Sequence, residues 1–168
     1  SYFVSNTNNF NNLKNKSMTP EDKKRISDLI EEHFDNFEPL VLTIDKDIDL
    51  PVEECINWSF LLIDLSTTKT GEIIDYIVRI QSGQYPIVFF KNIDCIRSRK
   101  DKADWEKLIL YGLKSENKTF VFDDKSALCG LADYHLPFSK IWVLCTCSEY
   151  PEFLKLKEKS ITRSNAGV

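Results

Sequence analysis

Glycine and long apolar runs are both scarce in this chain. Five glycines occur in 168 residues, and the first of them is Gly71. A loop that wraps phosphate groups with its backbone N–H groups needs glycines, so we expect no such loop before Gly71. The longest apolar runs, Phe60–Ile63 and Ile141–Cys145, are far shorter than the roughly 20 residues that span a bilayer. These shortages exclude a glycine-rich nucleotide loop in the N-terminal part and a membrane-spanning helix.

Histidine and paired cysteines are also scarce. The chain has two histidines and five cysteines, an odd number, and no Cys-x-x-Cys pair. We therefore expect reduced thiols, most of them in the core, rather than a disulfide framework or a metal site. The cysteines are Cys55, Cys95, Cys129, Cys145 and Cys147.

The charge balance is mildly acidic, with a formal net charge of −4 and a pI near 5.3. This balance does not favour nucleic acid as a partner, although a local basic patch remains compatible with it. The first residues show no charged stretch followed by an apolar one, so no signal peptide is expected. We expect a soluble, cytoplasmic protein that requires no cofactor.

The chain divides into a short tail and one domain. Residues 1–17 are rich in Asn and Ser without a sustained period, which predicts a flexible N-terminal segment. Residues 18–168 carry the regular patterns of a single domain. Thr19, Pro20 and Asp22 supply an N-cap, a proline at the first helical position and an acidic third residue. They predict an amphipathic helix from Pro20 to about Phe34.

Four short apolar runs predict strands that are buried on both faces, as in a parallel sheet. Helical patterns over residues 71–80 and 101–114 separate the later runs, and alternating strands and helices favour a doubly wound, three-layer α/β domain. Residues 118–139 fit either a hairpin insertion or an irregular excursion. The four runs are Leu40–Ile44, Phe60–Leu65, Ile87–Phe90 and Ile141–Cys145.

The segment Pro86–Ile96 contains a polar pattern directly after an apolar strand. It resembles the Walker B segment of AAA+ ATPases, a family with the P-loop NTPase fold, where such a strand runs into Asp-Glu, an apolar residue and another Asp. In that family the first Asp helps to hold magnesium and the Glu polarises the attacking water. Lys91 and Asn92 stand at those positions, and only Asp94 is kept. The resemblance therefore implies a degenerate Walker B.

Two later segments resemble other parts of the same family. Lys140–Ser148 is similar to the sensor 1 strand, with Ser148, or else Thr146, at the position of the polar sensor. Leu156–Arg163 is similar to the segment that carries the arginine finger of clamp-loader-type members, and Arg163 has the place of the finger. The resemblance extends over residues 39–163 as pattern and spacing.

The place of the family's P-loop carries a different chemistry. The strand at Leu40–Ile44 is followed by Asp45, Asp47 and Asp49, and three carboxylates repel a triphosphate. A competing match, Ser66–Thr70, precedes a helix as a Walker A Lys-Thr does, but it lacks both glycines. At Lys69 and Thr70 we weigh a residual phosphate site against a solvated helix N-terminus capped by Thr68 or Thr70.

A basic run stands out in this acidic chain. Arg97, Arg99, Lys100 and Lys102 follow the Walker-B-like strand closely. They form a candidate interaction patch for an acidic protein or a phosphate backbone, and the alternative is a solvated loop that leads into the next helix.

Three functional hypotheses follow from the sequence. The first is a pseudo-ATPase: a non-catalytic AAA+-like binding or assembly module, a scaffold or an arginine-finger donor to an active ATPase or an oligomer neighbour. The second is a Mg-dependent nuclease or phosphohydrolase on an unrelated α/β fold, which uses Asp45, Asp47, Asp49 or Asp64. The third is an accessory protein whose fold serves only for protein contacts.

Overall fold

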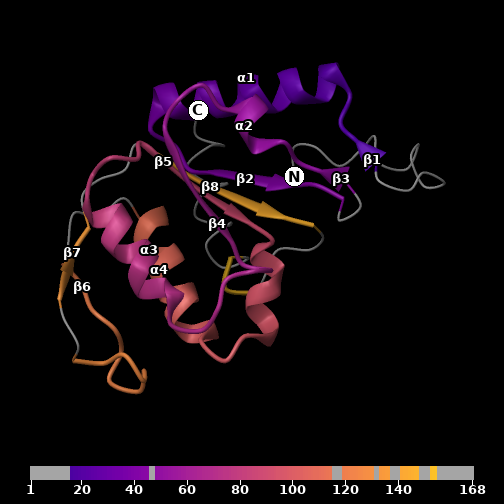
Figure 1. Cartoon of the computed structure of the whole chain (residues 1–168). Helices are drawn as coiled ribbons and strands as arrows, with labels where there is room; N and C mark the ends of the chain where they lie inside the picture. Colours follow the sequence, from indigo (N-terminus) through magenta and orange to yellow (C-terminus); the bar gives the residue numbers. More distant parts are fainter. Residues whose placement is uncertain are drawn as a thin grey trace.

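The computed structural model describes residues 16–45, 48–114, 119–130, 133–136, 141–147 and 152–154. Its centre is a four-stranded sheet in the order β2-β8-β5-β4, and every ladder in it is parallel. This sheet confirms the predicted α/β class and the four predicted strands (Figure 1). The strands are β2 (Leu40–Thr43), β4 (Phe60–Asp64), β5 (Ile87–Lys91) and β8 (Ile141–Thr146).

The sheet is buried on both faces, because successive side chains of each strand enter two different cores. In β5, Ile87 and Phe89 belong to one core, while Val88 and Phe90 belong to the other. All six residues of β8 are buried. The continuous apolar runs of the sequence therefore reflect a middle layer that is covered on both sides.

One face of the sheet is covered by α1 (Pro20–Asn36) and the short α2 (Val52–Cys55), as Figure 1 shows. The predicted cap of α1 is confirmed, because the Asp22 N–H donates to Thr19 Oγ1 at 3.1 Å. The helix ends two residues later than predicted, and Phe37 takes the left-handed conformation, with φ 55°, at its C-cap.

The other face is covered by α3 (Glu72–Gln81) and α4 (Lys102–Leu113). The 3₁₀ helix η2 (Ile93–Ser98) connects β5 to α4. Gly112 of α4 faces the ring of Trp142 in β8 so closely that a Cβ there would collide with the ring. Trp142 also stacks on Phe90, with ring centroids 5.4 Å apart. A glycine in α4 thus lets this helix approach the sheet.

The cap of α3 differs from the sequence interpretation, in which Thr68 or Thr70 caps the helix. The N-cap is Gly71, with φ 93°, and no side chain caps it. The Thr68 hydroxyl instead donates to the backbone oxygen of Asp64 at 2.6 Å, within the turn that leaves β4. The hydroxyl has a nearer partner in its own turn, which is the usual competition for Ser and Thr.

Two small sheets complete the described part of the chain. β1 (Lys16–Ser17) pairs in parallel with β3 (Ile48–Asp49). β6 (Thr119–Phe120) pairs antiparallel with β7 (Tyr134–His135). Residues 118–139, for which the sequence left two structures open, therefore contain a short pair of strands. Of the helices within the described ranges, none combines the length and apolarity that a membrane crossing requires.

Candidate functional site

Polar side chains collect where the parallel strands end. The carboxyl ends of all four strands lie at one edge of the sheet, which is the usual place for ligands in open α/β sheets. The strand register sets Asp64 beside Lys91 and Thr43 beside Thr146. We call this group the polar edge; it consists of Thr43, Asp64, Lys91, Asn92, Asp94 and Thr146.

Asp64 is tied into the polar edge by three donors to one oxygen. Its Oδ1 accepts from the Ser66 hydroxyl at 2.6 Å, from the Ser66 N–H at 3.0 Å and from the Asn92 amide at 2.8 Å. Burial alone would raise the pKa of Asp64, but these hydrogen bonds and the charge of Lys91 outweigh burial and lower the pKa. Asp64 is therefore held as a carboxylate.

Asn92 closes the end of β5. Its backbone takes the left-handed conformation with φ 57°, which Asn tolerates better than most residues, and it is the N-cap residue of η2. Its side-chain amide also lies 3.3 Å from the Ser66 hydroxyl oxygen. Asn92 thus links the ends of β4 and β5.

Asp94 connects η2 to the end of β8. Its Oδ1 accepts from the Thr146 hydroxyl and from the Cys147 N–H, each at 3.2 Å, and its Oδ2 accepts from the Cys147 thiol at 3.0 Å. Burial alone would raise the pKa of Asp94, but the hydrogen bonds from Cys147 and Thr146 prevail and lower it. Asp94 therefore binds the end of β8.

All five cysteines lie within the described residues, and none of them forms a disulfide. Cys145 is buried in β8, and burial raises the pKa of its thiol to about 12. Its neighbour Cys147 is half-buried, and its thiol donates to Asp94. Cys145 is thus an inert core thiol, as the sequence predicted, whereas Cys129 is exposed.

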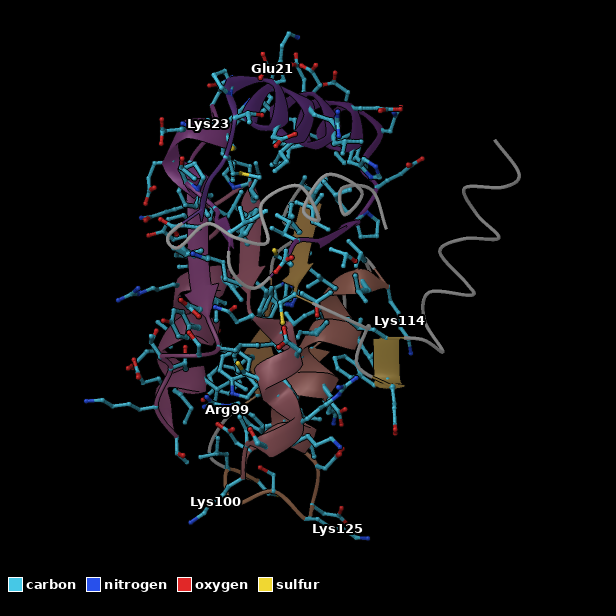
Figure 2. The ribbon with its side chains drawn as sticks, turned by 90° about the vertical axis from the view of Figure 1, so that its right-hand side faces the viewer. Glu21, Lys23, Arg99, Lys100, Lys114 and Lys125 are labelled. Atoms are coloured by element: carbon cyan, nitrogen blue, oxygen red, sulfur yellow. The ribbon has the colours of Figure 1, made fainter. Side chains whose placement is uncertain are left out.

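The basic run separates into two environments. Arg97, Lys100 and Lys102 are exposed, so three members of the candidate interaction patch lie at the surface. Only 13% of the Arg99 side chain is exposed, and its guanidinium contacts the interior. Figure 2 shows Arg99 and Lys100 at the end of the molecule opposite to Glu21 and Lys23 of α1.

Arg99 joins two segments that lie far apart in the sequence. Nε and Nη2 donate to the two carboxylate oxygens of Asp101, at 2.8 and 3.2 Å. Nη1 donates to the backbone oxygens of Thr68 at 2.6 Å and of Leu65 at 3.2 Å. Trp105 Nε1 also donates to Asp101. Together these hydrogen bonds fasten the turn after β4 to the first turn of α4.

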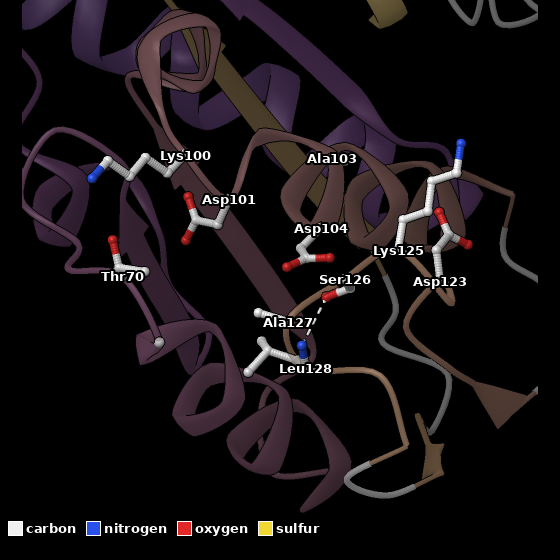
Figure 3. A pocket seen from close by; sticks show the side chains of 11 residues that line it. Thr70, Lys100, Asp101, Ala103, Asp104, Asp123, Lys125, Ser126, Ala127 and Leu128 are labelled. Atoms are coloured by element: carbon white, nitrogen blue, oxygen red, sulfur yellow. Dashed lines mark hydrogen bonds between the residues drawn. The ribbon is translucent and has the colours of Figure 1, made fainter.

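A cavity of about 470 Å³ lies beside this junction. Its walls are Thr70 and Gly71 at the start of α3, Lys100, Asp101, Ala103 and Asp104 at the start of α4, and Asp123 and residues 125–128 of the loop that follows β6 (Figure 3). Thr70 thus lies at the cavity wall, while the preceding Lys69 is exposed and its N–H donates to Glu72 Oε1 at 2.6 Å.

Several predicted residues lie outside the described part of the chain: Ser148, Arg163 and Asp47. Of the other carboxylates in the metal-enzyme hypothesis, Asp45 is half-buried and Asp49 is exposed. Within the residues that the structure describes, no three His, Cys, Asp or Glu side chains are placed to hold one metal ion together.

Sequence reasoning missed Ser66 as a partner of Asp64 and Arg99 as an interior residue. The Ser66–Asp64 contact could have been predicted, since a polar residue two positions after an Asp at a strand end often forms a hydrogen bond within the same turn. The interior position of Arg99 had no signal in the sequence, because the backbone oxygens that bind its Nη1 lie more than 30 positions away. No protein-family model, curated protein or solved structure matches this chain.

Proposed function

We propose that this protein is a non-catalytic binding or assembly module with an AAA+-like architecture, a pseudo-ATPase whose partner is another protein. The observation that carries the proposal is the Asn92–Asp64 hydrogen bond at the polar edge. An amide stands where the resembled family has its catalytic carboxylate, and it binds a neighbouring strand instead of facing a substrate water.

The arrangement of the strands supports the same proposal. The order β2-β8-β5-β4 sets the strand that resembles sensor 1 between the strand at the P-loop position and the strand that resembles Walker B. In the resembled family all three segments contact one nucleotide, so their carboxyl ends must be neighbours. Here Asp94, shortly after β5, contacts Thr146 at the end of β8, and Asn92 links the end of β5 to Asp64 at the end of β4.

Lys91 adds an electrostatic argument. It stands at the family's magnesium-binding position, and its charge lowers the pKa of the adjacent Asp64. An ammonium group cannot ligate a metal ion, and it repels one at close range. A magnesium nucleotide would therefore meet a cation at the place where it needs a carboxylate.

Calorimetric titration with ATP and with ADP, each with magnesium, tests the non-catalytic part of the proposal. We expect no heat and no thermal shift up to millimolar nucleotide. Micromolar binding would contradict the proposal. If this binding then disappeared in Lys69→Ala, the loop of Lys69 and Thr70 would be a working phosphate site.

The assembly part needs a purified partner. Cross-linking in cells followed by reconstitution should give a complex of defined stoichiometry in analytical ultracentrifugation. If this chain donates an arginine finger, Arg163→Ala should silence the partner's ATPase while the complex still forms. Partner activity that is unchanged in the variant would exclude the finger role and leave the scaffold role.

A further inference from the structure

The cavity at the starts of α3 and α4 has the size of a ligand site. Its volume of about 470 Å³ falls within the range of roughly 300–1,000 Å³ that is usual for such sites. It is separate from the polar edge, none of whose six residues lines it. The function proposed above leaves this cavity without a role.

The walls of the cavity are held in place by named contacts. Arg99 fastens Thr68, next to the α3 wall, to Asp101 in the α4 wall. Lys107 of α4 holds the third wall through a 2.7 Å ion pair with Asp123. Within that loop, the Leu128 N–H donates to Ser126 Oγ at 3.0 Å. A cavity formed in advance requires little ordering when a ligand enters.

The lining combines small apolar groups with three carboxylates and two lysines. Ala103, Ala127 and Leu128 supply apolar surface, and a Cβ at Gly71 would meet no atom within 4 Å, so the space beside that residue is open. Figure 3 shows the carboxylate of Asp104 directed across the cavity toward Ser126 and Ala127. A ligand that crosses the cavity would therefore contact an apolar wall and the Asp104 carboxylate together.

The other two carboxylates of the lining already have cationic partners. Asp101 is paired with Arg99, and Asp123 is paired with Lys107. Lys100 and Lys125 also line the cavity, and in Figure 3 the ends of their side chains point away from Asp104. Within the described ranges no hydrogen bond or ion pair of the Asp104 side chain is present, and a carboxylate in a confined space favours a cationic partner.

We propose that this cavity receives an arginine side chain of a partner protein. The guanidinium binds the Asp104 carboxylate, and the aliphatic stem packs against Ala103, Ala127 and Leu128. Arginine suits the site because its planar fork can bind both oxygens of a carboxylate while its stem covers apolar surface. The inference rests on the proposed function in so far as the arginine belongs to a protein partner.

The test uses N-acetyl-L-argininamide as the probe and N-acetyl-L-citrullinamide as its neutral control. In a ¹H–¹⁵N correlation spectrum, the arginine probe should shift the amide signals of Gly71, Asp104 and Ala127, and the citrulline probe should not. Asp104→Asn should weaken the arginine probe at least tenfold. The matched variant Asp75→Asn, at an exposed aspartate of α3 outside the cavity, should bind as the wild type does.

Equal shifts with the two probes, or shifts remote from the cavity, would overturn the proposal on wild-type protein alone, whether or not Asp104→Asn folds. Stronger shifts of the same signals with inorganic phosphate would assign the cavity to an anion and would also overturn it. The nucleotide titration is independent of these results. Nucleotide binding in that titration would refute the pseudo-ATPase function, while probe binding would still stand as a property of the cavity.

Discussion

Asp64 is the last residue of β4 and Asn92 directly follows the neighbouring β5, and the Asn92 amide donates a 2.8 Å hydrogen bond to the Asp64 carboxylate. The two residues are 28 positions apart in the sequence, so this bond fixes the relative position of two strand ends. A catalytic carboxylate at position 92 would face Asp64 with a like charge. The residue at position 92 can therefore either donate this hydrogen bond to Asp64 or supply a Walker-B-type carboxylate, but it cannot do both.

Replacing Asn92 by Asp tests this relationship. Asn92→Asp exchanges a donor for a second carboxylate beside Asp64, and we expect a loss of about 1–3 kcal/mol of unfolding free energy at pH 7. Because like charges raise the pKa of one member, the loss should shrink as the pH falls into the carboxyl range. Urea unfolding measures both effects. Asn57→Asp, at an exposed position, is the control, and equal stability of the two variants would contradict the prediction.

Asp94 should make the stability of the protein depend on pH. Its folded pKa is lowered from the ordinary value of 3.8. A group with a depressed folded pKa contributes stability that is fully present above the unfolded value and is lost as the pH falls through the folded value. Asp94→Asn should therefore be less stable than wild type at pH 7, and the difference should narrow below about pH 3.8.

Chemical unfolding at a series of pH values from about 7 to about 3, a range that includes the usual carboxyl pKa, measures this difference in stability. Asp75→Asn, exposed on α3, provides the comparison for the loss of an ordinary surface carboxylate. A difference between wild type and Asp94→Asn that stays constant over the whole series would show that the hydrogen bonds from Thr146 and Cys147 do not depend on the charge of Asp94.

Arg99 should matter for stability more than its exposed neighbours. Arg99→Ala leaves Asp101, whose side chain is 7% exposed, without its bidentate partner. We expect a loss of about 3 kcal/mol, typical of removing one member of a buried ion pair. Arg99→Lys should recover only part of it, because an ammonium group cannot reproduce the planar fork.

The control for Arg99 is Lys100→Ala, at the next position and exposed, which should stay within about 0.5 kcal/mol of wild type. Denaturant midpoints of the three variants decide the point. A loss in Lys100→Ala as large as that in Arg99→Ala would show that the basic run acts through its overall charge and not through the contacts of the guanidinium.

Gly112 should not tolerate a larger side chain. In Gly112→Ala the new methyl group would enter the space of the Trp142 ring, which is buried and stacked on Phe90. Overpacking of this kind costs about 1–3 kcal/mol, although alanine favours a helix by about 1 kcal/mol over glycine. Thermal unfolding gives the net effect. The double variant Gly112→Ala, Trp142→Leu should lose less than the sum of the single losses, and strict additivity would contradict the clash.

The sequence allowed the four central strands and the three longer helices to be predicted, because each has a sustained apolar pattern. Their order in the sheet was not predictable in this way. Leu40–Ile44 and Ile141–Cys145 are equally apolar, and apolarity does not say which of them is central. Burial separates them, since β8 is buried along its whole length while Val41 of β2 is half-exposed.

The polar edge was predictable in part. Lys91, Asn92 and Asp94 were recognised from a strand followed by polar residues, and Asp64 from its place at a strand end. Their partners were not, because Asn92 to Asp64 and Asp94 to Thr146 are contacts between segments 28 and 52 positions apart. Arg99 was grouped with surface lysines for the same reason, since a local pattern of charge carries no information about a distant carbonyl oxygen.

The inner position of β8 has a consequence for the order of events during synthesis. β8 pairs with both β2 and β5, yet it is the last strand of the sheet to leave the ribosome. Until Ile141–Thr146 has emerged, β2 lacks its partner in the sheet, and only β4 and β5 can form their ladder. Long-range pairings form slowly and leave apolar surface exposed in the meantime. The nascent chain therefore carries unpaired strand edges until β8 emerges, and closure of the sheet depends on this one six-residue segment.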